Sequence, residues 1–126
     1  GTELTEAEVI VAAGRGVGTP EHMKLIQRFA SLFPRSAVGG SRAACDMGLV
    51  DYGFQIGDTG RSVSPRLYIA CGISGSAQHI AGMKNSRIII AINRDETAPI
   101  FQVADVGIVD TIERFVPEFI EFYKKL

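Results

Sequence analysis

The chain has 126 residues, which is near the commonest size of a single domain. Apolar residues make up 46% and charged residues 21%, as is ordinary for a globular protein, and the net charge is -1. This balance argues against a broad electrostatic surface for nucleic acid, and no apolar run approaches the roughly 20 residues that span a bilayer. The two cysteines and two histidines lie in no metal-ligand spacing. We therefore expect no nucleic acid partner, no membrane insertion and no metal.

Strand and helix signals alternate along the chain. The apolar run 8–13 predicts a strand buried on both faces. Thr19 followed by Pro20 is typical of a helix start, and apolar residues continue at helical spacing to Phe33. In chain order we then expect a strand at 36–40, a short helix after Ser41, a long loop over 50–65, a strand at 67–71, a helix from Ser74 or Gly75 to about residue 82, strands at 87–92 and 106–109, and a last helix over 112–123 that restarts at Pro117.

This alternation predicts an α/β fold. Strands that alternate with helices imply right-handed crossovers, so we expect one Rossmann-like three-layer domain with a mostly parallel sheet and helices on both faces. In such sheets, ligands bind at the carboxyl ends of the strands. The glycine clusters at 14–18, 39–40 and 72–75 each follow a predicted strand. The sequence therefore predicts a ligand cleft at that edge of the sheet.

Two of these glycine loops carry an arginine. The segment GRGVG at 14–18 is one residue short of the dinucleotide fingerprint G-x-G-x-x-G, so it is either a plain turn or a place where Arg15 reaches a phosphate. Ser41 and Arg42 follow the second predicted strand. They are either a helix N-cap with a surface arginine, or an anion site made of a hydroxyl, a guanidinium and free amides.

The loop GISGSAQH at 72–79 is the most informative one. Its small residues allow the backbone to approach a ligand closely, and Ser74 and Ser76 offer hydrogen-bond donors to phosphate. His79 is either a proton donor to a ring heteroatom of a ligand or a hydrogen-bonded structural histidine. Ser74 lacks the G-x-S-x-G setting of a nucleophile, and both cysteines are typical of a buried core. Any chemistry is therefore expected to belong to a bound cofactor.

Four ordered segments carry a resemblance to a known family. They are GGSRAA at 39–44, QIGDTG at 55–60, LYIACGISGSAQHIAGMK at 67–84 and INRDETAPIF at 92–101. Together they closely resemble the C-terminal FAD-binding domain of the electron transfer flavoprotein alpha subunit, over almost the whole chain. The resemblance implies that residues 1–126 form this FAD-binding domain, without the N-terminal domain of the full alpha subunit.

The resemblance also implies a function. It suggests an electron carrier that binds one FAD and has no substrate turnover of its own. Members of the family pair with a beta subunit and pass electrons from dehydrogenases to an acceptor. Because the flavin of the family lies between the subunits, we expect weakened FAD binding in the chain alone. A bacterial or archaeal cytoplasmic location is expected in preference to the mitochondrial matrix.

Individual cofactor contacts follow from the same resemblance. Arg15 matches an arginine that touches the cofactor, Ser41 a serine at the diphosphate, and Arg42 an arginine near the isoalloxazine. Thr59 matches a threonine by flavin N5 and O4, His79 a histidine near O2, and Asn93 an asparagine on the adenosine side. The full set of implied cofactor-binding residues is Arg15, Ser41, Arg42, Ile56, Gly57, Asp58, Thr59, Ser74, Gly75, Ser76, Ala77, Gln78, His79, Asn93, Asp110 and Thr111.

Two places depart from the family pattern. Asp58 stands where the family usually has glutamine, and a carboxylate that points toward a flavin would disfavour its anionic forms. Thr111 and Ile112 stand where the family commonly has an acidic residue and a leucine, with Asp110 one position earlier. This second departure concerns the adenosine contact that the resemblance implies.

Two other classes of function are compatible with the same residues. A binding module could hold AMP or NAD for assembly or regulation, and a structural subunit could have lost its site. The presence of Thr59, Gln78 and His79 favours the flavin carrier over both.

Overall fold

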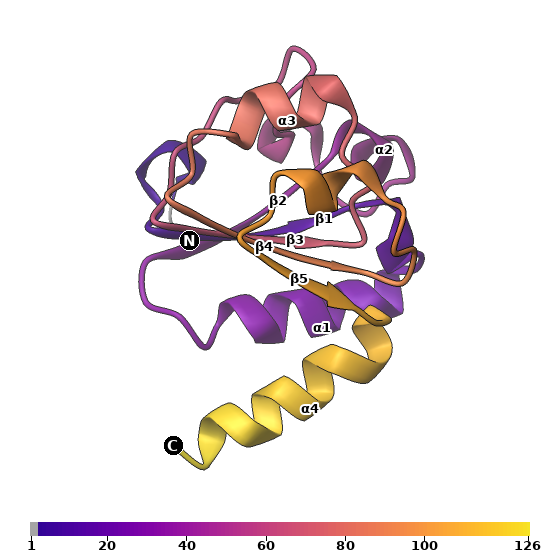
Figure 1. The fold of residues 1–126 in the computed structure, drawn as a ribbon. Helices are drawn as coiled ribbons and strands as arrows, with labels where there is room; N and C mark the ends of the chain where they lie inside the picture. Colours follow the sequence, from indigo (N-terminus) through magenta and orange to yellow (C-terminus); the bar gives the residue numbers. More distant parts are fainter. Residues whose placement is uncertain (1–2) are drawn as a thin grey trace.

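A five-stranded parallel sheet runs through the middle of the molecule (Figure 1). The computed structural model describes residues 3–126, so residues 1 and 2 of the expected domain lie outside the described residues. The strands lie in the order β2-β1-β3-β4-β5, and every neighbouring pair is parallel. Their bounds are β1 Val9–Ala13, β2 Ser36–Gly40, β3 Leu67–Cys71, β4 Ile88–Asn93 and β5 Val106–Val109. The predicted α/β fold is confirmed.

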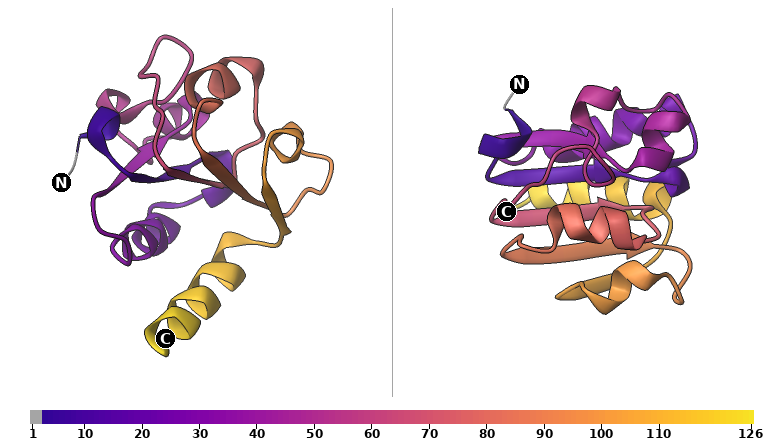
Figure 2. Two further views of the ribbon diagram at one scale, coloured as in Figure 1. Left: turned by 60° about the vertical axis from the view of Figure 1, so that its left-hand side comes forward. Right: turned by 90° about the horizontal axis from the view of Figure 1, so that it is seen from above.

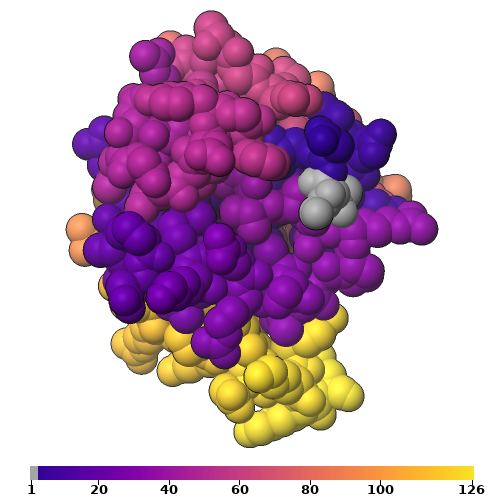
Figure 3. Space-filling view, turned by 180° about the vertical axis from the view of Figure 1, so that it is seen from behind, coloured from indigo at the N-terminus to yellow at the C-terminus, as the bar shows by residue number. Residues whose placement is uncertain are grey.

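Helices cover both faces of the sheet and complete the three expected layers (Figure 2). α1 (Pro20–Ala30) and α4 (Ile112–Lys124) lie on one face. Seen from behind, the yellow C-terminal residues of α4 lie below the indigo and purple residues of the N-terminal third of the chain (Figure 3). α3 (Ala77–Met83) lies on the other face. The short helices are η1 Leu4–Glu6, η2 Arg15–Val17, α2 Arg42–Asp46, η3 Tyr52–Phe54 and η4 Pro99–Gln102. Within residues 3–126, no helix has the length and apolar character that crossing a membrane requires.

Alternate side chains of the strands contribute to two separate cores. On β1, Val11 and Ala13 pack with residues of α1 and α4, whereas Ile10 and Ala12 belong to the core on the α3 side. This split arises because successive side chains of a strand point to opposite faces. Both faces of the sheet are covered, which explains why the strands read as continuous apolar runs in the sequence.

The start of α1 follows the predicted signals. The hydroxyl of Thr19 accepts a hydrogen bond from the backbone N–H of His22 at 3.2 Å, and Pro20 is the first helical residue. The helix ends at Ala30, before the predicted apolar spacing ends at Phe33. The ring of Phe33 still packs near that of Phe29, with ring centroids 5.8 Å apart.

Two helix predictions were wrong in detail. α3 begins at Ala77 and not at Ser74 or Gly75, because Gly75 has a φ of 93° and cannot be helical. Ser76 is the N-cap, and its hydroxyl accepts a hydrogen bond from the backbone of His79 at 3.3 Å.

The last helix does not restart at Pro117, since α4 continues through this residue. Proline removes one helical hydrogen bond, yet the buried side chains of Ile112, Val116 and Ile120 hold both halves of α4 against the sheet. Tertiary packing therefore outweighs the local helix-breaking signal.

The strand order reverses between β1 and β3, so the loops that follow these strands diverge. A crevice outside the carboxyl ends of strands at such a point is the usual ligand position in open parallel sheets. The two loops are tied at its floor, because Gly14 N–H donates to the Cys71 carbonyl at 2.8 Å and Gly16 N–H donates to the Gly72 carbonyl at 2.9 Å. A Cβ on Gly14 would lie 2.6 Å from the Cα of Ile73, so this approach requires glycine.

Candidate functional site

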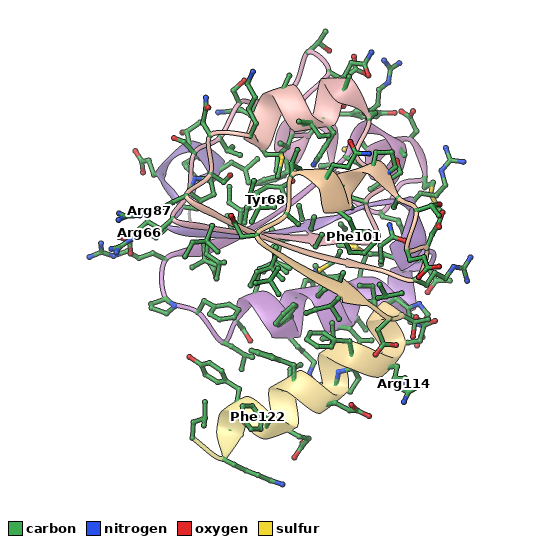
Figure 4. The ribbon with its side chains drawn as sticks, in the orientation of Figure 1. Arg66, Tyr68, Arg87, Phe101, Arg114 and Phe122 are labelled. Carbon is green, nitrogen blue, oxygen red and sulfur yellow. The ribbon has the colours of Figure 1, made fainter. Side chains whose placement is uncertain are left out.

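A cleft of about 760 Å³ opens at the carboxyl edge of the sheet. Its volume lies within the usual range for small-molecule and cofactor sites. Arg66 and Arg87, labelled in Figure 4, precede β3 and β4 and mark the opposite edge. The cleft is lined by the loops 15–19, 41–43, 72–76 and 93–99, together with His22, Ile56, Asp58, His79 and Glu113. The loops after β1, β2, β3 and β4 therefore meet where the glycine clusters predicted a ligand.

The structure brings together most of the predicted site residues. Those that line the cleft are Arg15, Ser41, Arg42, Ile56, Asp58, Ser74, Gly75, Ser76, His79 and Asn93. Those outside its lining are Gly57, Thr59, Ala77, Gln78, Asp110 and Thr111. Thr59, Ala77 and Gln78 are solvent-exposed, so their predicted cofactor contacts stay predictions.

Asp110 and Thr111 lie beside a separate small depression of about 70 Å³. This depression shares Gly16, Gly72 and Asn93 with the cleft, so the two hollows adjoin. The Asp110 carboxylate accepts a hydrogen bond from the backbone of Thr111 at 2.7 Å. The predicted adenosine contacts at these two residues would require a ligand that extends beyond the main cleft.

Ser41 serves as the predicted helix cap. Its hydroxyl accepts a hydrogen bond from the backbone of Ala44 at 3.2 Å at the start of α2, and the residue is buried. The hydroxyl lines the cleft from this position. The helix-cap interpretation of Ser41 is confirmed, and its contact with a diphosphate stays a prediction.

Arg42 carries a positive charge at the cleft that is already paired. Its Nη1 donates to the Asp58 carboxylate at 3.0 Å, and its Nε lies 3.7 Å from the Asp46 carboxylate. The hydrogen bond with Asp58 and the charges of both carboxylates raise the pKa of Arg42. The guanidinium is thus held by two acidic groups rather than presented alone.

The turn that carries Asp58 has an uncommon backbone. Gly57, Asp58 and Thr59 have φ values of 78°, 48° and 68°, all in the left-handed region. This region is disfavoured for residues with a side chain, and most strongly for a β-branched one such as Thr59. The buried Gln55 holds the turn, because its Nε2 donates to the carbonyls of Gly57 at 2.9 Å and Asp58 at 2.8 Å. Backbone strain of this kind often accompanies a functional position.

The cofactor-binding residues predicted from the sequence did not include Gln55. Its contacts are local, within three residues, and the polar side chain just before an Ile-Gly-Asp turn was the signal that could have identified it.

His79 lies on the inner wall of the cleft and is 3% exposed. Its Nδ1 lies 3.1 Å from the carbonyl of Ile56, and its Nε2 lies 2.7 Å from the hydroxyl of Tyr68. Because a carbonyl can only accept, Nδ1 carries the proton, and the Tyr68 hydroxyl donates to Nε2. Burial lowers the pKa of His79 to about 4, so the ring is neutral at pH 7.

This geometry favours the structural interpretation of His79. Both ring nitrogens already have partners inside the protein, so a hydrogen bond to a ligand atom would require Nε2 to leave Tyr68. Tyr68 comes from β3 and lies between the sheet and α3 (Figure 4). Tyr68 was predicted only as part of the strand at 67–71, and no local pattern in the sequence indicated that its hydroxyl would bind His79. The donor role of His79 toward a flavin stays a prediction.

Asn93 ties together two loops at the rim. Its Nδ2 donates to the carbonyl of Ile73 at 3.0 Å, and its Oδ1 accepts from the backbone of Asp95 at 2.9 Å. Asp95 in turn accepts from Thr97, and these hydrogen bonds lower the pKa of Asp95. The loop after β4 is thus fixed against the loop after β3.

Arg15 and Arg94 supply further positive charge to the cleft. Both are exposed and line it, and within residues 3–126 neither forms an ion pair. Arg94 was absent from the predicted site residues, although its place directly after a predicted strand and Asn93 was a usable signal. Two unpaired guanidinium groups favour an anionic ligand. Across the part of the chain that the structure describes, no group of three His, Cys, Asp or Glu residues could hold a metal ion.

Known proteins match the chain along its length. The family model described as "Electron transfer flavoprotein FAD-binding domain" matches residues 3–84. The electron transfer flavoprotein subunit alpha of Bacillus subtilis is 52% identical over all of this chain and 38% of its own length. Protein FixB of Clostridium saccharobutylicum is 49% identical over 98% of the chain and 37% of its own length. The mitochondrial electron transfer flavoprotein subunit alpha of Dictyostelium discoideum is 52% identical over 98% of this chain and 34% of its own length.

The chain spans little more than a third of the length of these curated relatives. The family match includes the loops after β1, β2 and β3 and the turn at 57–59, but it ends before Asn93, Asp110 and Thr111. Given the match over more than half of the chain, and the identity of about half to the relatives, this chain belongs to the electron transfer flavoprotein FAD-binding domain family.

Proposed function

We propose that the cleft binds FAD and that the chain is the FAD-binding part of an electron transfer flavoprotein alpha subunit. The observation that carries this proposal is the cleft at the strand reversal, which combines glycine loops with Arg15 and Arg94, both without an ion pair within residues 3–126. A dinucleotide cofactor has a negative diphosphate and flat rings, and such a cleft suits both. The family description supports the choice of FAD over other dinucleotides.

The residues of the cleft fit a cofactor of this kind. Gly72 and Gly75 have φ values of 66° and 93°, and a Cβ on Gly75 would lie 2.6 Å from the backbone nitrogen of Ile100. These glycines therefore allow the loop 72–76 to pack tightly against neighbouring backbone, which fixes the shape of this side of the cleft. Arg15 and Arg94 would bind the diphosphate, and Ser74 would add a hydroxyl beside them.

Bound FAD would supply the reversible uptake of electrons, and the chain would bind and orient it. We propose an electron carrier that receives electrons from dehydrogenases while paired with a beta subunit. The two cysteines do not offer a competing nucleophile, because both are buried and burial raises the pKa of each thiol. We also propose a bacterial or archaeal cytoplasmic setting; two of the three relatives described above are bacterial and one is mitochondrial.

Titration of the purified chain with FAD tests the proposal. We expect quenching of flavin fluorescence and, after removal of free ligand, FAD as the flavin identified by mass spectrometry. Arg15→Gln should weaken binding roughly two- to fivefold, because it removes one exposed charge from the cleft. Arg28→Gln is the matched control, since Arg28 is exposed on α1 and does not line the cleft.

The alternatives give different results in the same experiment. If the chain does not bind FAD but binds AMP or NAD, it is a nucleotide-binding module. If it binds none of the three, it is a structural subunit. Addition of a beta subunit should tighten FAD binding, because we expect part of the flavin to be exposed in the chain alone. Equal affinity with and without that subunit would contradict this expectation.

A further inference from the structure

Asp58 is one of three carboxylates in the cleft lining, with Asp95 and Glu113, and it is the one that pairs with an arginine there. It lines the cleft together with Arg42, and the two side chains form an ion pair with 3.0 Å between Oδ2 and Nη1. The side chain of Asp58 is 31% exposed and that of Arg42 is 60% exposed, so solvent and a ligand can reach both. Among the three arginines that line the cleft, only Arg42 has an acidic partner within the part of the chain that the structure describes.

The carboxylate is held in place by the backbone beneath it. Gln55 binds the carbonyls of Gly57 and Asp58, and Gly57 packs so closely on α3 that a Cβ there would lie 2.7 Å from the Cα of His79. The Arg42 side chain is long and mostly exposed, and it has several rotatable bonds. In this pair, therefore, the backbone of the aspartate is held, and the arginine has the longer side chain that can move away.

The rest of that wall offers no positive charge. His79 is buried, and Tyr68 and the Ile56 carbonyl occupy its ring nitrogens. Among the arginines that line the cleft, Arg42 is therefore the one that pairs with the turn at 57–59 within residues 3–126, and its availability affects the charge that a ligand meets there.

We propose that Asp58 determines the affinity of the cleft for an anionic ligand, because its carboxylate competes with that ligand for the Arg42 guanidinium. The inference rests on the proposed function, with FAD as the anionic ligand. With the ion pair intact, the two charges nearly cancel for a ligand in the cleft. When the ligand binds, its negative charge must draw the guanidinium away from Asp58 or share it.

Substitution of Asp58 by asparagine tests the competition. Asparagine tolerates left-handed backbone as aspartate does, so the turn should be retained. We expect the D58N chain to bind FAD roughly two- to fivefold more tightly than the original chain, with a steeper loss of affinity as salt is added. Riboflavin has the same ring system but no diphosphate and no net charge, so it should show no such gain, even though the resemblance places Arg42 near the isoalloxazine.

Two further variants make the test specific. Asp46→Asn removes the other carboxylate beside Arg42, but Asp46 lies outside the cleft lining, 3.7 Å from Nε and 51% exposed, so its gain should be smaller. In an Arg42→Gln background, Asp58→Asn should lose most of its effect, because the contested cation is gone.

Several outcomes would overturn the inference. They are an unchanged FAD affinity in D58N, an equal gain for riboflavin, an equal gain in D46N, or a full gain in the Arg42→Gln background. The proposed function fails in a different way, namely if the original chain binds no FAD at all, and the inference would then fall with it. Thermal melting of each variant identifies any change that comes from misfolding.

Discussion

The cleft has two regions that differ in charge and burial. The inner wall, which we define as Ile56 and His79 with Tyr68 behind them, is buried and joined by hydrogen bonds at both ring nitrogens of His79, and its imidazole is neutral at pH 7. The rim, which we define as Arg15, Arg42 and Arg94, is exposed and charged. The rim residues follow β1, β2 and β4, whereas Ile56 lies in the loop before β3, Tyr68 on β3 itself and His79 on α3.

This difference indicates that the inner wall mainly affects stability and the rim mainly affects ligand binding. Buried hydrogen-bonded groups contribute strongly to stability, because an unpaired partner is costly away from water. Exposed charges contribute little to stability but act on any charged ligand that enters. Changes in the inner wall should therefore alter the free energy of unfolding, and changes in the rim should alter ligand affinity.

The largest effect should come from the floor that both regions share. Gly14→Ala would place a methyl group against Gly72 and 2.6 Å from the Cα of Ile73, so the two loops must separate. We expect a loss of about 3 kcal/mol in the free energy of unfolding, seen as a fall of about 10 °C in melting temperature, with loss of FAD binding. Gly53→Ala is the control, since nothing lies within 4 Å of a Cβ there. A Gly14→Ala chain as stable as that control would contradict the packing at the floor.

The pH dependence of stability tests the neutral state of His79. Its pKa is lowered to about 4 in the folded chain, whereas an unfolded histidine titrates near 6.5. Between these values, the unfolded chain takes up a proton that the folded chain does not, so stability should fall as pH falls from about 6.5 toward 4. The full effect is at most about 3 kcal/mol.

Urea unfolding from pH 7 to pH 4.5 measures this loss. His79→Gln should unfold more easily at pH 7 and show a flatter pH profile. If the variant keeps both the stability and the pH profile but lowers the reduction potential of bound FAD, His79 is instead the flavin-facing donor that the resemblance implied.

Removal of one hydroxyl group probes the inner wall more gently. Tyr68→Phe would leave Nε2 of His79 without its donor in a buried place, at an expected loss of about 1–3 kcal/mol in the free energy of unfolding. The imidazole ¹⁵N signals should shift as well, because the Nε2 hydrogen bond disappears. Tyr52→Phe is a matched control, since its hydroxyl binds Asp46 at the exposed surface. Equal losses in the two variants would argue against a special role for the buried pair.

The sequence predicted those parts of the molecule that depend on local patterns. The strand at 67–71 and the cap at Thr19 follow from apolar runs and from side chains that bind nearby backbone. The cleft followed from glycine clusters, because the carboxyl ends of parallel strands meet at one edge.

Contacts between distant residues were beyond the same reasoning. The Tyr68 hydroxyl reaches a histidine eleven positions away across two layers, and Arg42 reaches a carboxylate sixteen positions away. Neither pairing leaves a periodic or local signal, since each depends on how separate loops come together. The continuation of α4 through Pro117 was missed for a related reason, because packing against the sheet decided it.

The smallest effect on stability, and a clear one on binding, should come from salt. The screening length falls from about 10 Å at 0.1 M to about 3 Å at 1 M, so exposed guanidinium groups lose most of their attraction for a diphosphate over this range. We expect FAD affinity to fall severalfold from 0.05 to 0.5 M sodium chloride, while the melting temperature changes by no more than about 2 °C, because the inner wall is uncharged. Arg15→Gln should reduce the slope of affinity against salt, and Arg28→Gln should not. If salt instead lowered the melting temperature and left FAD affinity unchanged, charge would stabilise the fold rather than recruit the ligand, and the distinction between rim and inner wall would be wrong.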